Sequence, residues 1–252
     1  MSNSSLVTYT KISPNKTSPR NHKVDTISIH CAVGQFTAKQ LLNLSHFVKY
    51  DANKGSSCNY AIGCDGSVGM GVEEKDRSWC TSSRSNDHRA ITIEVASDTE
   101  HPYAVTDKAY KALISLLVDI CKRNGIKELK WEGDKSLIGQ VDKQNMTVHR
   151  WFANKACPGD YLYNRHGKIS KEVNSRLNTK KDSTSKAFQV KIDITNLNIR
   201  KGPGTNYAKT GKFTGKGVFT IVDESSGKGS TKGWGKLKSG AGWVSLDFAK
   251  KI

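Results

Sequence analysis

One stretch of the chain, residues 148–160, concentrates side chains that could do chemistry. It reads Val-His-Arg-Trp-Phe-Ala-Asn-Lys-Ala-Cys-Pro-Gly-Asp and holds His149, Lys155 and Cys157 within nine residues. An imidazole and a thiolate are both good zinc ligands, but a catalytic zinc site commonly takes three protein ligands and leaves one position for water. A third ligand must therefore come from another part of the chain.

His30 is the candidate for that third ligand. Residues 24–30 alternate apolar and polar side chains, which indicates a half-buried strand with His30 at its end. Two neutral imidazoles and one thiolate would leave a zinc site with a net charge of about +1, so the metal could still acidify water and polarise a carbonyl. By spacing alone, the same three residues also fit a buried thiol beside two surface histidines.

The elements that must position these residues alternate between strands and helices. A strand over residues 89–96 places Thr92 and Glu94 on one face. A carboxylate in such a run is either functional or a salt-bridged or edge residue. The longest predicted helix begins after Thr106 and stops at Asn124-Gly125. This alternation predicts an α/β fold with a central mixed β-sheet flanked by helices.

The character of the chain changes after residue 178. Residues 179–186 form a polar stretch that predicts a linker, and residues 187–252 hold short β-like runs punctuated by glycine. We therefore expect three parts: a first domain over residues 1–178, a linker over 179–186, and a small all-β barrel over 187–252.

Charge is concentrated in the C-terminal part. The net charge is +17, and residues 179–252 hold 15 Lys/Arg and five Asp/Glu, a net +10. Such a segment should seek a polyanion, either nucleic acid or an anionic cell-wall polymer such as teichoic acid. Charge alone does not separate the two, but the segment lacks a basic run interleaved with aromatics, so we do not expect nucleic acid.

The protein is expected to be made and folded in a cytoplasm. No basic and apolar secretory signal follows Met1, and no apolar run is long enough to span a membrane, so membrane insertion is not expected. Reduced cysteines are then the default. Cys31 is expected to pack away from the strand face of His30, whereas Cys58, Cys64 and Cys80 are expected to be free thiols, with a second metal site or a disulfide as alternatives.

Residues 20–178 resemble the type 2 N-acetylmuramoyl-L-alanine amidases, which are related to peptidoglycan recognition proteins. The motifs are residues 26–30, 59–62, 90–94 and 149–159. The C-terminal part resembles a bacterial SH3-type (SH3b) domain through residues 197–204 and 240–244. The combination looks like a bacteriophage endolysin or a bacterial autolysin.

The resemblance implies a zinc hydrolase with one Zn²⁺ per catalytic domain, held by His30, His149 and Cys157. Lys155 matches a lysine that stabilises the oxyanion, and Glu94 and Tyr60 match residues that could handle proton transfer, with the choice between them left open. Three further residues are candidates for substrate contact: Trp79, Asn86 and Trp151. Core packing is as plausible for the two tryptophans, and a turn role is favoured for the asparagine.

The implied reaction is hydrolysis of the amide between N-acetylmuramic acid and L-alanine in peptidoglycan. The expected partners are peptidoglycan and anionic wall polymers, with no obligate protein partner. An endolysin of this class is made in the host cytoplasm and reaches the wall after a holin opens the membrane. The alternatives are a host autolysin with the same activity, a peptidoglycan-binding protein that does not cut, and nucleic-acid binding.

Overall fold

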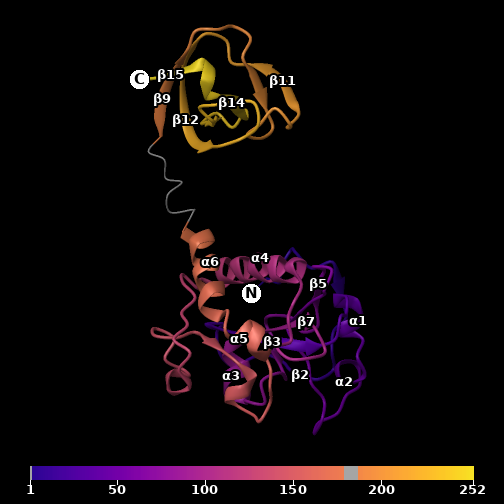
Figure 1. Cartoon of the computed structure of the whole chain (residues 1–252). Coiled ribbons are helices and arrows are strands. Elements are labelled where there is room, and N and C mark those ends of the chain that lie inside the picture. Colours follow the sequence, from indigo (N-terminus) through magenta and orange to yellow (C-terminus); the bar gives the residue numbers. More distant parts are fainter. Residues whose placement is uncertain (1, 179–186) are drawn as a thin grey trace. The chain divides into compact units, whose positions relative to one another are not determined.

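The structure, a computed structural model, describes residues 2–178 and 187–252. The expected linker over residues 179–186 lies outside these described residues. The chain divides into two compact units, Met1–Leu177 and Asn178–Ile252 (Figure 1). No helix in the described part of the chain is long and apolar enough to cross a membrane.

The first unit is built on a six-stranded mixed sheet in the order β1-β5-β4-β7-β3-β8. Only the β4–β5 pair in this sheet is antiparallel. The predicted mixed α/β architecture is therefore confirmed. The strands of this sheet are β1 (Tyr9–Thr10), β3 (Thr26–Val33), β4 (Tyr60–Ile62), β5 (Val68–Met70), β7 (Ala90–Ser97) and β8 (Met146–Thr147); β2 (Lys16–Thr17) and β6 (Arg77–Ser78) form a separate two-stranded sheet.

Helices and short turns surround this sheet. The longest, α4 (Asp107–Asn124), begins after the N-cap Thr106 and ends at Gly125, whose φ of 70° is the left-handed conformation that glycine adopts without strain, as the sequence predicts. The other helical elements are α1 (Ala38–Leu42), α2 (Ser45–Val48), α3 (Arg84–Arg89), η1 (Lys135–Leu137), η2 (His149–Trp151), α5 (Gly159–Tyr163) and α6 (His166–Asn178).

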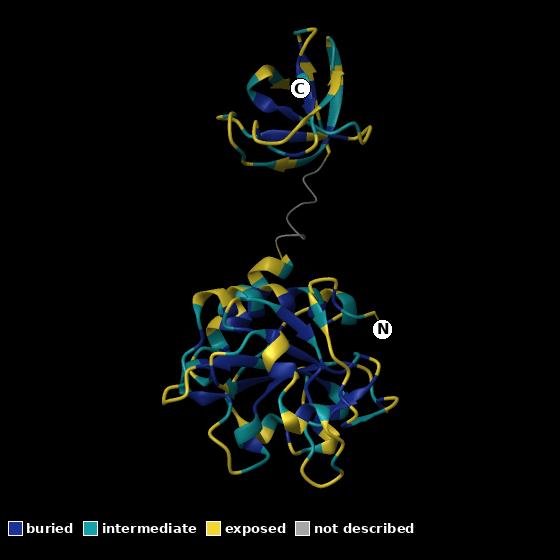
Figure 2. Ribbon diagram, turned by 90° about the vertical axis from the view of Figure 1, so that its right-hand side faces the viewer, coloured by how far each residue is buried: buried dark blue, intermediate teal, exposed yellow. Residues whose placement is uncertain are grey.

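The two faces of the sheet have different neighbours. On one face, Ile29 of β3 and Ile93 of β7 pack with Leu113 and Leu117 of α4 in the main core. On the other face, Ala61 of β4 packs with residues of α1 and α2 in a smaller core. The central strands β3 and β7 are buried along most of their length (Figure 2). This burial fits parallel strands that are covered on both faces.

Trp131, Trp151 and His166 form an aromatic cluster in the first unit. Trp151 lies stacked on Trp131 with ring centroids 5.0 Å apart, and the His166 ring lies 4.4 Å from Trp131. His166 is fully buried, and its Nε2 has no hydrogen-bond partner among the described residues. Burial lowers the pKa of His166 to about 4, so the folded protein holds this ring neutral.

Replacing His166 by phenylalanine should reduce the acid sensitivity of folding. Because the folded-state pKa lies below the ordinary value of 6.5, this histidine contributes stability above pH 6.5 that is lost as the pH falls towards 4. For the metal-free protein, the loss in unfolding free energy between pH 7.5 and 4.5 should be about 2–3 kcal/mol smaller in H166F. Denaturant titrations at both pH values measure it, and equal losses in the two proteins would contradict the expectation.

The second unit is a single seven-stranded antiparallel sheet in the order β11-β10-β14-β13-β12-β9-β15. It has its own core, which includes Ile199, Ile221 and Val244. An all-β C-terminal part is therefore confirmed. Its elements are β9 (Phe188–Ile192), β10 (Asn198–Arg200), β11 (Lys209–Phe213), β12 (Gly217–Ser225), β13 (Trp234–Leu237), β14 (Trp243–Ser245), η3 (Leu246–Phe248) and β15 (Ala249–Lys251).

Candidate metal centre and adjoining groove

Three neighbouring parallel strands bring the candidate site together. His30 of β3 lies directly opposite Glu94 of β7, and β8 on the other side of β3 leads through Val148 into His149. Because side chains alternate along a strand, His30 and Glu94 share the face that is turned away from α4. His30 was expected at the end of its strand, but β3 continues to Val33 because the residues after His30 also pair with β7.

His30, His149 and Cys157 lie close enough to hold one metal ion. One donor atom from each residue lies within 4.8 Å of the other two. The Cys157 Sγ lies 3.3 Å from Nδ1 of His30, and the two imidazole centroids are 5.2 Å apart. The structure thus brings together the three residues that the sequence proposed as ligands.

Serine hydroxyls orient both imidazoles. The Ser28 Oγ lies 3.2 Å from Nε2 of His30, and the Ser82 Oγ lies 3.1 Å from Nε2 of His149. Metal-binding histidines almost always make such a hydrogen bond through the other ring nitrogen. The period of two along β3 could have revealed Ser28, whereas no sequence signal pointed to Ser82.

The protonation states also suit a metal. Burial, followed by the neighbouring His149, lowers the pKa of His30 to about 3, so its imidazole is neutral as a ligand must be. Burial and the Lys155 ammonium lower the pKa of His149. The Cys31 thiol and burial raise the pKa of Cys157, and a bound cation would be needed to deprotonate it. The donor types, their distances and their oriented rings therefore fit zinc.

Glu94 reaches the same place. Its Oε1 lies 3.8 Å from Nδ1 of His30 and accepts a weak hydrogen bond from the Cys80 thiol, also at 3.8 Å. The Oε2 atom is buried without a partner among the described residues, and burial raises the pKa of Glu94 to about 7. Cys80, expected to be a free thiol, forms with His30 and Glu94 a second set of donors within 4.8 Å. This proximity was not foreseen from the sequence.

A groove of about 670 Å³ adjoins the donors; its wall includes Arg77, Trp79, Cys80, Ser82, His149 and Lys155. Lys155 is exposed, and its ammonium makes no hydrogen bond or ion pair with residues 2–178 or 187–252. Trp79 is half-buried, and its Nε1 donates a hydrogen bond to Thr17 Oγ1 at 3.0 Å. Lys155 and Trp79 thus both line the groove beside His149.

Arg150 holds the loop between His149 and Cys157 in shape. Its guanidinium donates to the Asp160 carboxylate at 3.0 Å and to the carbonyl of Ala156 at 2.6 Å. The φ of Gly159 is 74°, and a Cβ at this position would lie 2.8 Å from the Cβ of Tyr103, so only glycine fits there. Arg150 is a positioning residue that the sequence analysis missed.

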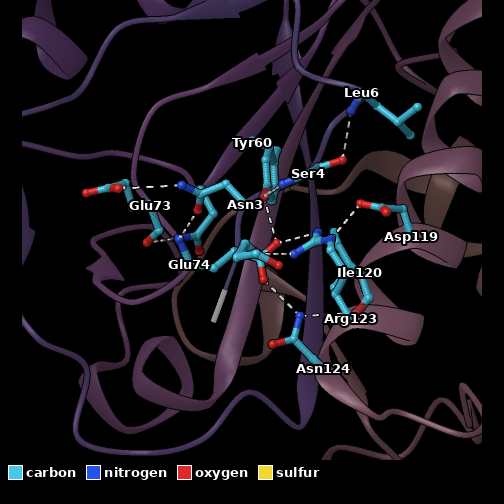
Figure 3. Close-up of polar contacts among 12 residues, drawn as sticks. Asn3, Ser4, Leu6, Tyr60, Glu73, Glu74, Asp119, Ile120, Arg123 and Asn124 are labelled. Atoms are coloured by element: carbon cyan, nitrogen blue, oxygen red, sulfur yellow. Dashed lines mark hydrogen bonds and ion pairs between the residues drawn. The ribbon is translucent and has the colours of Figure 1, made fainter.

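Tyr60, one of the two candidates for proton transfer that the sequence left open, does not belong to this site. It pairs with Ile93 on β7 and therefore points to the α4 face, opposite to Glu94. Its hydroxyl donates to Glu74 Oε1 at 2.6 Å and accepts from the Ser4 backbone N–H at 2.9 Å (Figure 3). The same Glu74 carboxylate also accepts from Arg123 and Asn124 of α4. Tyr60 is thus part of a buried structural network.

Tyr60→Phe should therefore affect folding and leave catalysis intact. The change removes a donor to the fully buried Glu74 and leaves the Ser4 N–H unpaired, which should cost about 1–3 kcal/mol of unfolding free energy. We expect kcat/KM on purified walls to stay within about twofold of the wild type. Denaturant titration and an amide-hydrolysis assay measure the two effects. A large loss of activity at normal stability would restore Tyr60 to the site.

Two other candidates for substrate contact are also placed in packing roles. Trp151 is 8% exposed and stacks on Trp131, so neither sugar nor peptide can reach its faces. Asn86 is 5% exposed and donates to Thr81 Oγ1 at 3.3 Å, under the loop that carries Ser82. The burial therefore favours the alternatives to substrate contact, which are core packing for Trp151 and a local structural role for Asn86.

Comparison with known families decides the classification. The family model Amidase_2, N-acetylmuramoyl-L-alanine amidase, matches residues 20–160, which include the whole donor set. The chain belongs to this amidase family. A comparison with curated protein sequences gives no match.

Several solved structures are similar to this family member. N-acetylmuramoyl-L-alanine amidase LysC from Clostridium intestinale URNW is 17% identical, with 68% of this chain and 96% of that chain covered and a TM-score of 0.47. A selenomethionine derivative of AmpD is 18% identical, with 66% and 95% covered and a TM-score of 0.48. Drosophila peptidoglycan recognition protein SD is 19% identical, with 61% and 85% covered and a TM-score of 0.46. Because these structures are only 17–19% identical to the chain, its classification rests on the family model over residues 20–160.

Proposed function

We propose that this member of the amidase family is a zinc-dependent N-acetylmuramoyl-L-alanine amidase that hydrolyses the amide between N-acetylmuramic acid and L-alanine in peptidoglycan. The observation that carries the proposal is the convergence of His30, His149 and Cys157 within 4.8 Å, beside a groove, in a chain of this family. These three residues would hold the ion. When bound there, zinc supplies a Lewis acid that acidifies water and polarises a carbonyl oxygen.

Glu94 is the group proposed to move the protons. Amide hydrolysis needs a base for the attacking water and an acid for the leaving nitrogen, and a group with a pKa near the working pH serves both tasks best. Burial brings the pKa of Glu94 to about 7, and its Oε2 is not engaged by any described residue. The carboxylate can therefore accept the proton of water and then deliver it to nitrogen.

Lys155 and Trp79 are proposed to act on the substrate. Because the Lys155 ammonium is exposed at the groove and not paired with any described residue, it can donate to the oxygen on which negative charge develops as the tetrahedral intermediate forms. Trp79 presents a half-buried ring at the same groove, and such a ring packs well against a sugar or stem-peptide face.

The second unit is proposed to be an SH3-type wall-binding domain. Its small antiparallel sheet, its separate core and its net charge of +8 over residues 187–252 (12 Lys/Arg and four Asp/Glu) support this role. The proposed organisation is a catalytic domain over residues 1–178, a linker over 179–186 and a wall-binding domain over 187–252. A wall-cutting domain joined to a wall-binding one suits a phage endolysin.

Product analysis on purified cell walls tests the activity. The intact chain should release new N-terminal alanine from the walls, at a bound zinc content near one per chain. A chain that sediments with walls but exposes no new alanine would be a binding protein, and the proposal would be wrong. Activity that survives complete removal of metal, with refilling excluded by a chelator, would overturn the zinc requirement.

A further inference from the structure

A row of three cationic side chains and one tryptophan crosses the outer face of the seven-stranded sheet in the second unit. Backbone pairing places Lys209 of β11 opposite Arg200 of β10, Arg200 opposite Trp243 of β14, and Trp243 opposite Lys236 of β13. The row ends at Asp223 of β12, which lies opposite Lys236. Residues directly opposite each other in a sheet share one face. The residues next to them in sequence, Ile199, Leu237 and Val244 among others, fill the core, so the row faces outward.

Within the fold, the lysines at the two ends of this row have no ion pair with a described residue, whereas the Arg200 guanidinium donates to the carbonyls of Thr205 and Tyr207. Lys209 and Lys236 are exposed, and Arg200 and Trp243 are half-buried. The Lys236 ammonium lies 6.0 Å from the Trp243 ring centroid. Like charges directly opposite each other, as at Lys209 and Arg200, destabilise a sheet. A bound anion beside Lys209 and Arg200 would offset this repulsion.

We infer that this row (Lys209, Arg200, Trp243 and Lys236) binds a phosphodiester-linked polyol or sugar polymer attached to the cell wall. This inference rests on the proposed wall-binding role of the second unit. From Lys209 to Lys236 the row covers three strand spacings, roughly 14 Å. A polymer that alternates phosphates with polyol or sugar units can place anions on the lysines and an apolar face on Trp243.

Two pairs of lysines allow a test with two double variants that have the same net charge. Lys209→Gln/Lys236→Gln removes two cations of the row. Lys191→Gln/Lys250→Gln removes two exposed lysines that lie opposite each other on β9 and β15, at the far end of the sheet. There, Lys191 forms a salt bridge with Asp193 at 3.3 Å. Arg200 is left unchanged because its guanidinium donates to the carbonyls of Thr205 and Tyr207 and supports that loop.

The measurement is sedimentation of the full chain with two wall preparations from one Gram-positive strain. One preparation is native, and the other has been treated with hydrofluoric acid, which removes phosphodiester polymers and leaves peptidoglycan. The wild type should bind the native walls at least about tenfold more tightly than the treated ones. K209Q/K236Q should lose about fivefold to tenfold in affinity for native walls. Its slope of log affinity against log salt should be smaller in magnitude by about 1.4, at about 0.7 per lost phosphate contact. The affinity and the slope of K191Q/K250Q should stay near those of the wild type.

Three results would overturn the inference. The wild type could bind both wall preparations equally, which would exclude the polymer. Both double variants could lose binding equally, which would reduce the effect to net charge. DNA at equal phosphate concentration could displace the chain from native walls more effectively than the isolated wall polymer does, which would favour nucleic acid. Release of new N-terminal alanine from the treated walls tests the amidase separately, because its failure leaves these binding results unchanged.

Discussion

Replacing His149 by alanine is expected to reduce the release of new N-terminal alanine from purified walls to the level of the enzyme-free control. His149 is one of three donors within 4.8 Å, and the remaining two cannot hold a catalytic zinc site in the usual three-ligand form. The zinc content of the variant should fall together with its activity. Elemental analysis and mass spectrometry of the digested walls measure both.

A second histidine variant serves as the control for this experiment. His22 lies before β3 and contacts Asp25 at 3.6 Å, outside the donor set. H22A should therefore keep its zinc and its activity. Near-normal thermal unfolding of H149A would show that the loss is local. Full activity in a folded, zinc-depleted H149A would exclude the proposed centre.

Replacing Glu94 by glutamine is expected to lower kcat/KM for wall hydrolysis by about 10²–10⁴-fold, the usual contribution of general acid–base catalysis. The amide has nearly the same shape but can neither accept the proton of water nor deliver one to nitrogen. Because His30, His149 and Cys157 remain, zinc binding should stay near one ion per chain. This combination separates loss of proton transfer from loss of metal.

Glu100→Gln is the matched control because Glu100 is exposed in the turn after β7, away from the groove residues. It should be as active as the wild type. If E94Q instead loses its zinc, Glu94 acts as a metal ligand. If E94Q keeps both zinc and activity, another group carries the protons, and the role proposed for Glu94 is wrong.

The sequence predicted what local patterns can encode. Period-two alternation placed Thr92 and Glu94 on one face, and capping residues marked both ends of α4. The residue types at positions 30, 149 and 157 suggested a donor set, which the pairing of β8 with β3 and the loop that follows η2 then bring together. In each case, the information lies within a few residues or in a family motif.

The expectations that failed depended on partners far away in the sequence. The face of Tyr60 is set by its register with Ile93, and the burial of Trp151 by its stacking on Trp131. Nothing local to either residue carries that information. The cationic row was missed for the same reason, since its members come from four strands and become neighbours only through the pairing of the sheet.

The placement of His30 and Glu94 on paired central strands has a consequence for protein engineering. Their separation is set by backbone hydrogen bonds between β3 and β7, whereas one part of the groove wall comes from the loop over residues 52–56, which carries none of the donors. Exchange of that loop should therefore change which wall chemistry is accepted while the reactive groups keep their spacing. The scaffold thus separates the part that must stay fixed from the part that can be redesigned.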